Sequence, residues 1–132
     1  MLNMTTNETA VRELIERWAK AVRDKDFVEI LRNHAADMVM FDVPTLQLKG
    51  IEEYRDSWEP FYLASPEPVA FDIQELSVTA GEDVAFAFAL MHCRVKEKGG
   101  ISDLDFRLTI GLRKIQGQWL ITHEHHSVPA ES

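Results

Sequence analysis

The residues best suited to chemistry in this chain of 132 amino acids lie together near its C-terminus, where four consecutive positions hold titratable side chains. They are His123, Glu124, His125 and His126, and they include three of the five histidines of the sequence. Imidazole exchanges protons near neutral pH and binds zinc, and a neighbouring carboxylate can orient it for either task. We call these four residues the histidine segment and treat it as the first candidate for a functional site.

The histidine segment lies in a stretch whose composition is typical of a β-strand. Side chains alternate between the two faces of a strand. We therefore expect His123 and His125 to share the face of Ile121. Glu124 and His126 should point to the opposite face. Alternation thus divides the cluster between two environments, so that its four side chains cannot all serve one site.

A metal site is the first chemistry to consider. His123 and His125 would lie roughly 7 Å apart along a strand, which suits two ligands of one zinc ion. A third ligand must come from elsewhere, and His92 would have to reach across from another strand. No further set of His, Cys and Asp residues occurs at ligand spacing. We therefore expect no metal, and we expect the histidines to be hydrogen-bonded to polar groups near Arg107 or across a subunit interface.

Asp42 is the second candidate, because it ends a short apolar strand, 38–43, just before Pro44. A carboxyl group at the edge of an apolar cavity is stabilised in its neutral form, which suits a general base near neutral pH. The alternative is structural: an aspartate in this place commonly forms a turn before the proline. Both interpretations stay open at the level of the sequence.

Arg107 joins the candidates if a bulge shifts the pairing of the strands. Such a shift would bring Arg107, His123 and His125 together as a polar floor suited to a carboxylate or an enolate. A slip of one residue exchanges the two faces of a strand. The sequence therefore leaves two sets open for the pocket, these three residues or Glu124 with His126.

Large apolar side chains are candidates for the walls of a ligand pocket. Pockets for small molecules are mostly apolar and contain a few convergent polar groups. The same side chains would otherwise form the core of the protein. The candidates that we single out are Trp18, Tyr54, Trp58 and Met91.

The overall composition argues against several classes of partner. Fourteen Lys and Arg residues against 22 Asp and Glu residues give a net charge of −8. Nucleic acids and anionic membranes both require basic surface, so we expect neither as a partner. Cys93 is the single cysteine, which excludes an intramolecular disulfide and fits a reducing compartment. Neither a signal peptide nor a membrane-spanning run is visible, so we expect a cytoplasmic protein.

The elements that must position these residues follow from the hydrophobic periodicity. Thr5 and Glu8 form a capping box that opens a first helix, and a short second helix begins near Phe27. A third helix contains Tyr54 and should be kinked or ended by Pro60. After residue 69 the period changes to two, and turn residues separate four long strands. We expect these strands at about 69–79, 84–96, 102–115 and 118–128. Helices followed by an antiparallel meander indicate an α+β fold, which we expect to form one domain over 1–132.

A set of residues along the last two expected strands forms a recognisable pattern. Its members are Arg107, Thr109, Gly117, Trp119, Ile121, His123, His125, Ser127 and Pro129. Together with the order of the elements, this pattern resembles the nuclear-transport-factor-2-like, or cystatin-like, superfamily. The chain is most similar to its SnoaL-like and ketosteroid-isomerase-homologue proteins. The C-terminal pattern is also similar to the association domain of calcium/calmodulin-dependent protein kinase II.

The resemblance implies a cone, in which a strongly curved antiparallel or mixed sheet wraps around three N-terminal helices and encloses an apolar cavity. It also implies dimers or higher oligomers that form through the outer face of the sheet, and we expect a homodimer. In ketosteroid isomerases a strand aspartate before a proline is the proton-shuttling base, and Asp42 matches that place. By similarity to the kinase domain, Glu124 and His126 would face the cavity. His123 and His125 would then face the partner subunit.

Two functions from different classes are compatible with the resemblance. The first is a small-molecule enzyme, of the isomerase, lyase or cyclase type, that moves a proton next to a carbonyl group without a cofactor. Asp42 would be its base, and the residues that could stabilise the developing oxyanion are Arg107, His123, His125 and His126. The second is a non-catalytic ligand-binding or oligomerisation module. In both cases we expect the ligand to be a small apolar or carbonyl-containing molecule.

Overall fold

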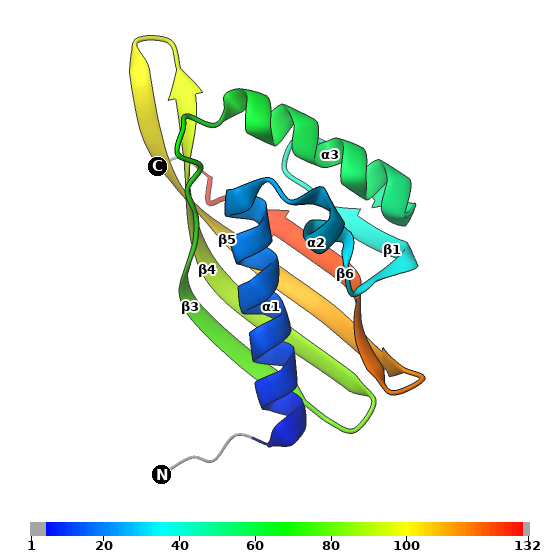
Figure 1. The fold of residues 1–132 in the computed structure, drawn as a ribbon. Helices are drawn as coiled ribbons and strands as arrows, with labels where there is room; N and C mark the ends of the chain where they lie inside the picture. The colour runs from blue at the N-terminus through cyan, green and yellow to red at the C-terminus, as the bar shows by residue number, and fades with distance from the viewer. Residues whose placement is uncertain (1–4, 131–132) are drawn as a thin grey trace.

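The computed structural model describes residues 5–130 and shows three helices on the concave side of a curved, six-stranded sheet (Figure 1). The helices are α1 (Thr6–Asp24), α2 (Phe27–Leu31) and α3 (Gly50–Ala64). The strands are β1 (His34–Phe41), β2 (Leu48–Lys49), β3 (Phe71–Ala80), β4 (Val84–Glu97), β5 (Gly100–Ile115) and β6 (Gln118–Ser127). This α+β architecture confirms the fold that the sequence predicted, with small shifts at the ends of the strands. The sheet is curved but does not close into a barrel.

The first helix is capped as its sequence indicates and packs into the hollow of the sheet. The backbone N–H of Glu8 donates to the Thr5 hydroxyl over 3.1 Å, and the Glu8 carboxylate accepts from the Thr5 N–H over 2.9 Å. An apolar stripe that includes Val11, Ile15 and Trp18 is buried. In Figure 1, α1 crosses the concave side of the sheet beside β3 and β4. No helix within residues 5–130 is long and apolar enough to cross a membrane.

The six strands form one sheet in the order β2-β1-β6-β5-β4-β3. All neighbouring strands are antiparallel except β1 and β6, which run parallel. The parallel pair joins the beginning of the sheet region to the end of the chain, so that His34 lies beside Ile121. This pairing brings β1 next to the histidine segment of β6.

The two faces of β4 differ in the size of their side chains. On β4 the inward positions include Ala85, Ala87 and Ala89, which are buried and leave room for α1. The outward positions of the same strand include Phe86 and Phe88, which are half exposed. On β5 the expected apolar face is confirmed, and its buried side chains are Phe106, Leu108, Ile110 and Leu112.

The third helix does not end at its proline. It continues through Pro60 to Ala64. A proline in a helix removes one N–H donor and one hydrogen bond to the residue four positions earlier. That residue is Asp56, whose side chain is exposed, so water can hydrate this part of the helix. Pro60 also lines the pocket described below, so the helix carries an apolar side chain there without a break.

Candidate functional site

A bulge in β6 determines which side chains reach the interior. Leu112 of β5 pairs with Ile121, whereas the preceding residue, Gly111, pairs with His123. Two steps along β6 therefore correspond to one step along β5, and Thr122 is the extra residue. The Thr122 hydroxyl donates to the Gly111 carbonyl over 3.3 Å, which places a hydrogen bond at the bulge.

The bulge reverses the alternation of the side chains along β6. Ile121 points inward before the bulge, and Glu124 and His126 point inward after it. His123 and His125 point outward. The expectation that these two histidines share the face of Ile121 is therefore wrong. The extra residue shifts the alternation by one position, so the residues after it have exchanged faces.

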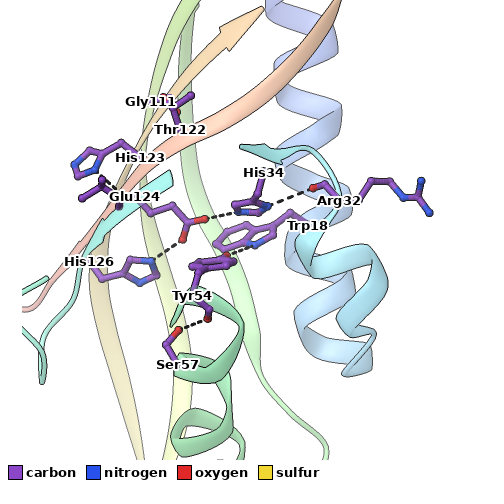
Figure 2. Close-up of polar contacts among 11 residues, drawn as sticks. Trp18, Arg32, His34, Tyr54, Ser57, Gly111, Thr122, His123, Glu124 and His126 are labelled. Carbon is purple, nitrogen blue, oxygen red and sulfur yellow. Dashed lines mark hydrogen bonds and ion pairs between the residues drawn. The ribbon is translucent and has the colours of Figure 1, made fainter. Parts of the chain in front are cut away.

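Glu124 is fully buried and lies between two histidines (Figure 2). Its Oε2 is 2.7 Å from Nε2 of His34, and its Oε1 is 3.0 Å from Nε2 of His126. Burial alone would raise the pKa of Glu124, but the hydrogen bonds from His126 and His34 outweigh burial and lower it to about 2. The carboxylate is therefore ionised at neutral pH, and it is stabilised as a buried charge must be, by close hydrogen-bonded partners.

The ionised carboxylate determines where the protons of both imidazoles lie. A carboxylate only accepts hydrogen bonds, so Nε2 of His34 and Nε2 of His126 both carry a proton. Nδ1 of His34 lies 3.3 Å from the carbonyl oxygen of Arg32, which is also an acceptor. Both ring nitrogens of His34 therefore face acceptor oxygens, one on Glu124 and one on the backbone of Arg32. Among residues 5–130, no group is hydrogen-bonded to Nδ1 of His126.

Tyr54 is buried and packs against His34 of this cluster. Its hydroxyl accepts from Nε1 of Trp18 over 3.0 Å, and its ring lies 4.6 Å from the His34 ring, centroid to centroid (Figure 2). Burial raises the pKa of Tyr54 well above its ordinary value, and the nearby charge of Glu124 raises it further. The phenol therefore stays protonated and behaves as part of the packed core.

His126 connects the cluster to a pocket of about 590 Å³. The pocket lies between α3, the segment after β1 and the inner face of β4 and β5. The His126 ring stacks on Phe106 with an angle of 8° between the rings, so its orientation is fixed by packing as well as by Glu124. The other aromatic lining residues are Trp58, Phe61 and Phe71.

Asp42 lines the same pocket but also takes part in a turn. Its carboxylate accepts from the N–H of Val43 over 2.8 Å, and its own N–H donates to the carbonyl of Thr45 over 3.3 Å. Both interpretations of Asp42 therefore have a counterpart in the structure. It is a turn residue whose carboxylate lies at the pocket.

Three of the other residues predicted for the site lie on the outer face of the sheet. Arg107 is exposed, and its Nε donates to the hydroxyl of Ser127 over 3.0 Å. The rings of His123 and His125 both pack edge-on against Phe41, at 4.9 and 5.3 Å. The structure does not bring these three residues together with Glu124 and His126, so one strand presents histidines to two separate environments.

The four apolar wall candidates also divide into two groups. Trp58 lines the pocket. Trp18, Tyr54 and Met91 are buried in the core and do not line it. Cys93, which we did not select, does line the pocket, but burial raises the pKa of its thiol to about 11, so it is protonated and a poor nucleophile.

His34 is the site residue that the sequence analysis missed. It is separated from Glu124 by 90 positions, and the parallel pairing of β1 with β6 brings the two together. The expected first strand begins at residue 38, whereas β1 begins at His34, so this histidine lies outside the expected strand. Within residues 5–130 no three His, Cys, Asp or Glu side chains are arranged to hold a metal ion. His34, Glu124 and His126 are instead connected by hydrogen bonds of 2.7 and 3.0 Å.

Comparison with known proteins identifies relatives of this chain. Residues 11–131 match the SnoaL-like domain family. A nuclear-transport-factor-2-like protein of unknown function from Pseudomonas putida has a solved structure with 37% sequence identity. The match covers 98% of this chain and 92% of that one, with a TM-score of 0.85. No curated protein matches the chain.

More distant structures share the fold alone. A candidate calcium/calmodulin-dependent protein kinase II association domain from Xanthomonas campestris is 22% identical, with a TM-score of 0.76 over 92% of this chain and 87% of that one. A ketosteroid isomerase-like protein from Erwinia carotovora is 15% identical, with a TM-score of 0.80 over 97% of this chain and 100% of that one. Both agree with the resemblance seen in the sequence.

Proposed function

Since the chain belongs to the SnoaL-like family, we propose that it binds a small, largely apolar molecule in the pocket and moves a proton next to a carbonyl group of that molecule, without a cofactor. One observation carries this proposal. His126 lines the pocket while its Nε2 is hydrogen-bonded to a fully buried, ionised Glu124. A histidine that is oriented by a carboxylate and open to an apolar pocket has the arrangement of a general base.

The proposed step uses Nδ1 of His126, which has no hydrogen-bond partner among residues 5–130. Nδ1 accepts a proton from the carbon next to the carbonyl, and the electron pair of that C–H bond forms an enolate. The resulting imidazolium is stabilised by Glu124, because its Nε2–H already donates to that carboxylate. Return of the proton to another carbon completes an isomerisation and regenerates the base, so the step requires no oxidant or reductant.

Asp42 is the second proposed base. It lines the same pocket, but its carboxylate is hydrogen-bonded only to the neighbouring backbone among residues 5–130. His126 has the more complete arrangement, since Glu124 holds its ring and Phe106 stacks on it. We therefore assign the proton transfer to His126 first and to Asp42 second.

Deuterium exchange on a model ketone tests the proposal without knowledge of the natural substrate. β-Tetralone, an apolar ketone with acidic C–H bonds, is incubated with the protein in deuterium oxide, and loss of the C–H signal is followed by proton NMR. We expect exchange above the buffer rate, and we expect His126→Gln to lower the enzymatic part by about 100-fold or more. The Asp42→Asn variant tells whether the second base contributes.

His125→Gln is the matched control, because His125 is the adjacent histidine but points away from the pocket. It should leave exchange unchanged. Equal activity of the native protein and His126→Gln would show that His126 is not the base. Binding of the ketone without exchange would favour the alternative function, a ligand-binding module that performs no chemistry.

We further propose that the chain forms a homodimer through the outer face of the sheet and functions in the cytoplasm. The dimer is supported by half-exposed apolar side chains in one row on β4, namely Phe86, Phe88 and Leu90. Contiguous apolar surface of this kind is typical of a protein interface. The cytoplasmic location is supported by the free and buried Cys93.

A further inference from the structure

We propose that the pocket selects an uncharged, largely apolar molecule that presents a hydrogen-bond donor, such as a phenol or enol hydroxyl, to Nδ1 of His126, and that it rejects carboxylates. This inference rests on the proposed function for the choice of the pocket. It goes further by specifying the charge and the polarity of the ligand.

The charges around the pocket exclude anions. The titratable acids that line it are Asp42, Glu53 and Asp56, and no Lys or Arg is found among the described lining residues. A carboxylate that enters an apolar pocket loses its hydration and needs a cationic partner to offset that loss. The described pocket residues supply no permanent cation, and the carboxylates repel a second negative charge.

The buried partner of His126 adds to this selection. His126 already donates its Nε2–H to the Glu124 carboxylate, so Nδ1 of the neutral ring carries a lone pair. Binding of an anion at His126 would therefore require an additional proton on that ring. A neutral ligand requires no such change.

The position of the proton on His126 specifies the complementary group on the ligand. Nε2–H is bonded to Glu124, so Nδ1 of the neutral ring has a lone pair and accepts. A ligand hydroxyl, or a C–H made acidic by a carbonyl, donates to that nitrogen. An ether oxygen in the same place is an acceptor and leaves Nδ1 without a partner, which weakens binding.

The walls require the remainder of the ligand to be apolar. Trp58, Phe61 and Phe71 line the pocket together with Leu104 and Val95. A volume of about 590 Å³ lies in the usual range for drug-sized molecules. A fused aromatic ring system therefore fits the walls, and a single polar group is sufficient to orient it at His126.

Three molecules with the same ring system test the proposal. β-Naphthol is an uncharged donor, β-naphthyl methyl ether lacks the donor, and β-naphthoate is an anion. Each is titrated into isotope-labelled protein at neutral pH, and binding is followed through the NMR shifts of pocket residues. We expect the naphthol to bind most tightly, the ether about tenfold more weakly, and the naphthoate more weakly than both.

Two variants assign the selection to individual residues. His126→Phe removes the accepting nitrogen, so the preference for naphthol over the ether should disappear, while His125→Phe should retain it. Asp56→Lys changes an exposed side chain at the pocket and leaves the buried cluster intact. It should raise the affinity for naphthoate several-fold and change the affinity for naphthol by a smaller factor, so that the ratio of the two affinities shifts toward the anion. Because this second variant does not disturb the core, it keeps the test valid even if His126→Phe fails to fold.

The possible outcomes separate this inference from the proposed function. Naphthoate binding that equals or exceeds naphthol binding overturns the inference, and so does the absence of pocket shifts with all three molecules. Selective binding of naphthol without deuterium exchange on β-tetralone overturns the catalytic proposal and supports the inference. Exchange that is equally fast on a carboxylated tetralone supports catalysis and overturns the inference.

Discussion

Glu124 is the residue on which the candidate site depends, because it holds two imidazoles at once. Its Oε2 accepts from Nε2 of His34 over 2.7 Å, and its Oε1 accepts from Nε2 of His126 over 3.0 Å. These two close donors offset the cost of burying the carboxylate. One residue thereby gives the proposed base, His126, a fixed hydrogen bond.

This arrangement makes acid stability depend on Glu124. Its pKa in the folded protein is about 2, whereas the ordinary value is 4.5. A group whose pKa is lower in the folded than in the unfolded state contributes stability above the unfolded pKa, and that stability is lost as the pH falls toward the folded pKa. We therefore expect a loss of up to roughly 3 kcal/mol between about pH 4.5 and pH 2 from this group alone.

Urea unfolding at a series of pH values measures this contribution. The Glu124→Gln variant should be less stable at neutral pH, and its free energy of unfolding should fall less steeply below pH 4.5. Glu59→Gln, on the exposed side of α3, serves as the control and should follow the native curve. If the free energy of unfolding depends on pH in the same way for Glu124→Gln and for the native protein, the lowered pKa of Glu124 is wrong.

At the scale of the elements, the sequence predicted the strands well and their faces less well. The period of two in β5 correctly indicated that Phe106 and Leu108 are buried. In β6 the same rule failed at Thr122, because a bulge adds one residue without a change in composition. The contribution of His34 was not predictable either, since it depends on the pairing of strands at opposite ends of the chain. Propensity and alternation are local, whereas register is a property of the whole sheet.

The bulge itself can be tested by deletion of Thr122. Without the extra residue, the two halves of β6 can no longer both keep their present orientation. Either Ile121, before the deletion, or Glu124, after it, must point outward. We expect the free energy of unfolding, measured in urea, to fall by roughly 3–5 kcal/mol. Either choice exposes side chains that are now buried or leaves a buried charge without its partners. Thr122→Val keeps the number of residues and removes only the hydrogen bond to Gly111, so it should cost about 1 kcal/mol. Similar costs for the two variants would indicate that the hydrogen bond, and not the residue count, matters.

At the scale of the whole molecule, the two sides of the sheet have different surroundings. All three helices lie on its concave side (Figure 1), and the pocket lies between α3 and the inner face of β4 and β5. The convex side is covered by no helix of residues 5–130. The apolar row on β4 lies there, and one of its members, Leu90, lies between residues of opposite charge. Leu90 pairs with Glu75 on one side and with Arg107 on the other. A surface with opposite charges on either side of an apolar row can be complementary to its own copy about a two-fold axis.

The proposed dimer is tested by a charge in the middle of this row. Phe88 is 55% exposed in the single chain, so Phe88→Glu should not disturb the core. We expect the native protein to sediment as a dimer at micromolar concentration and Phe88→Glu to sediment as a monomer, because two such charges would be buried together without partners. Leu63→Glu is the control, since Leu63 is 79% exposed but lies on α3, and it should stay dimeric. A native protein that is monomeric at micromolar concentration would show that the convex side has another role, and the pocket proposals, which use the concave side of the same chain, would be unaffected.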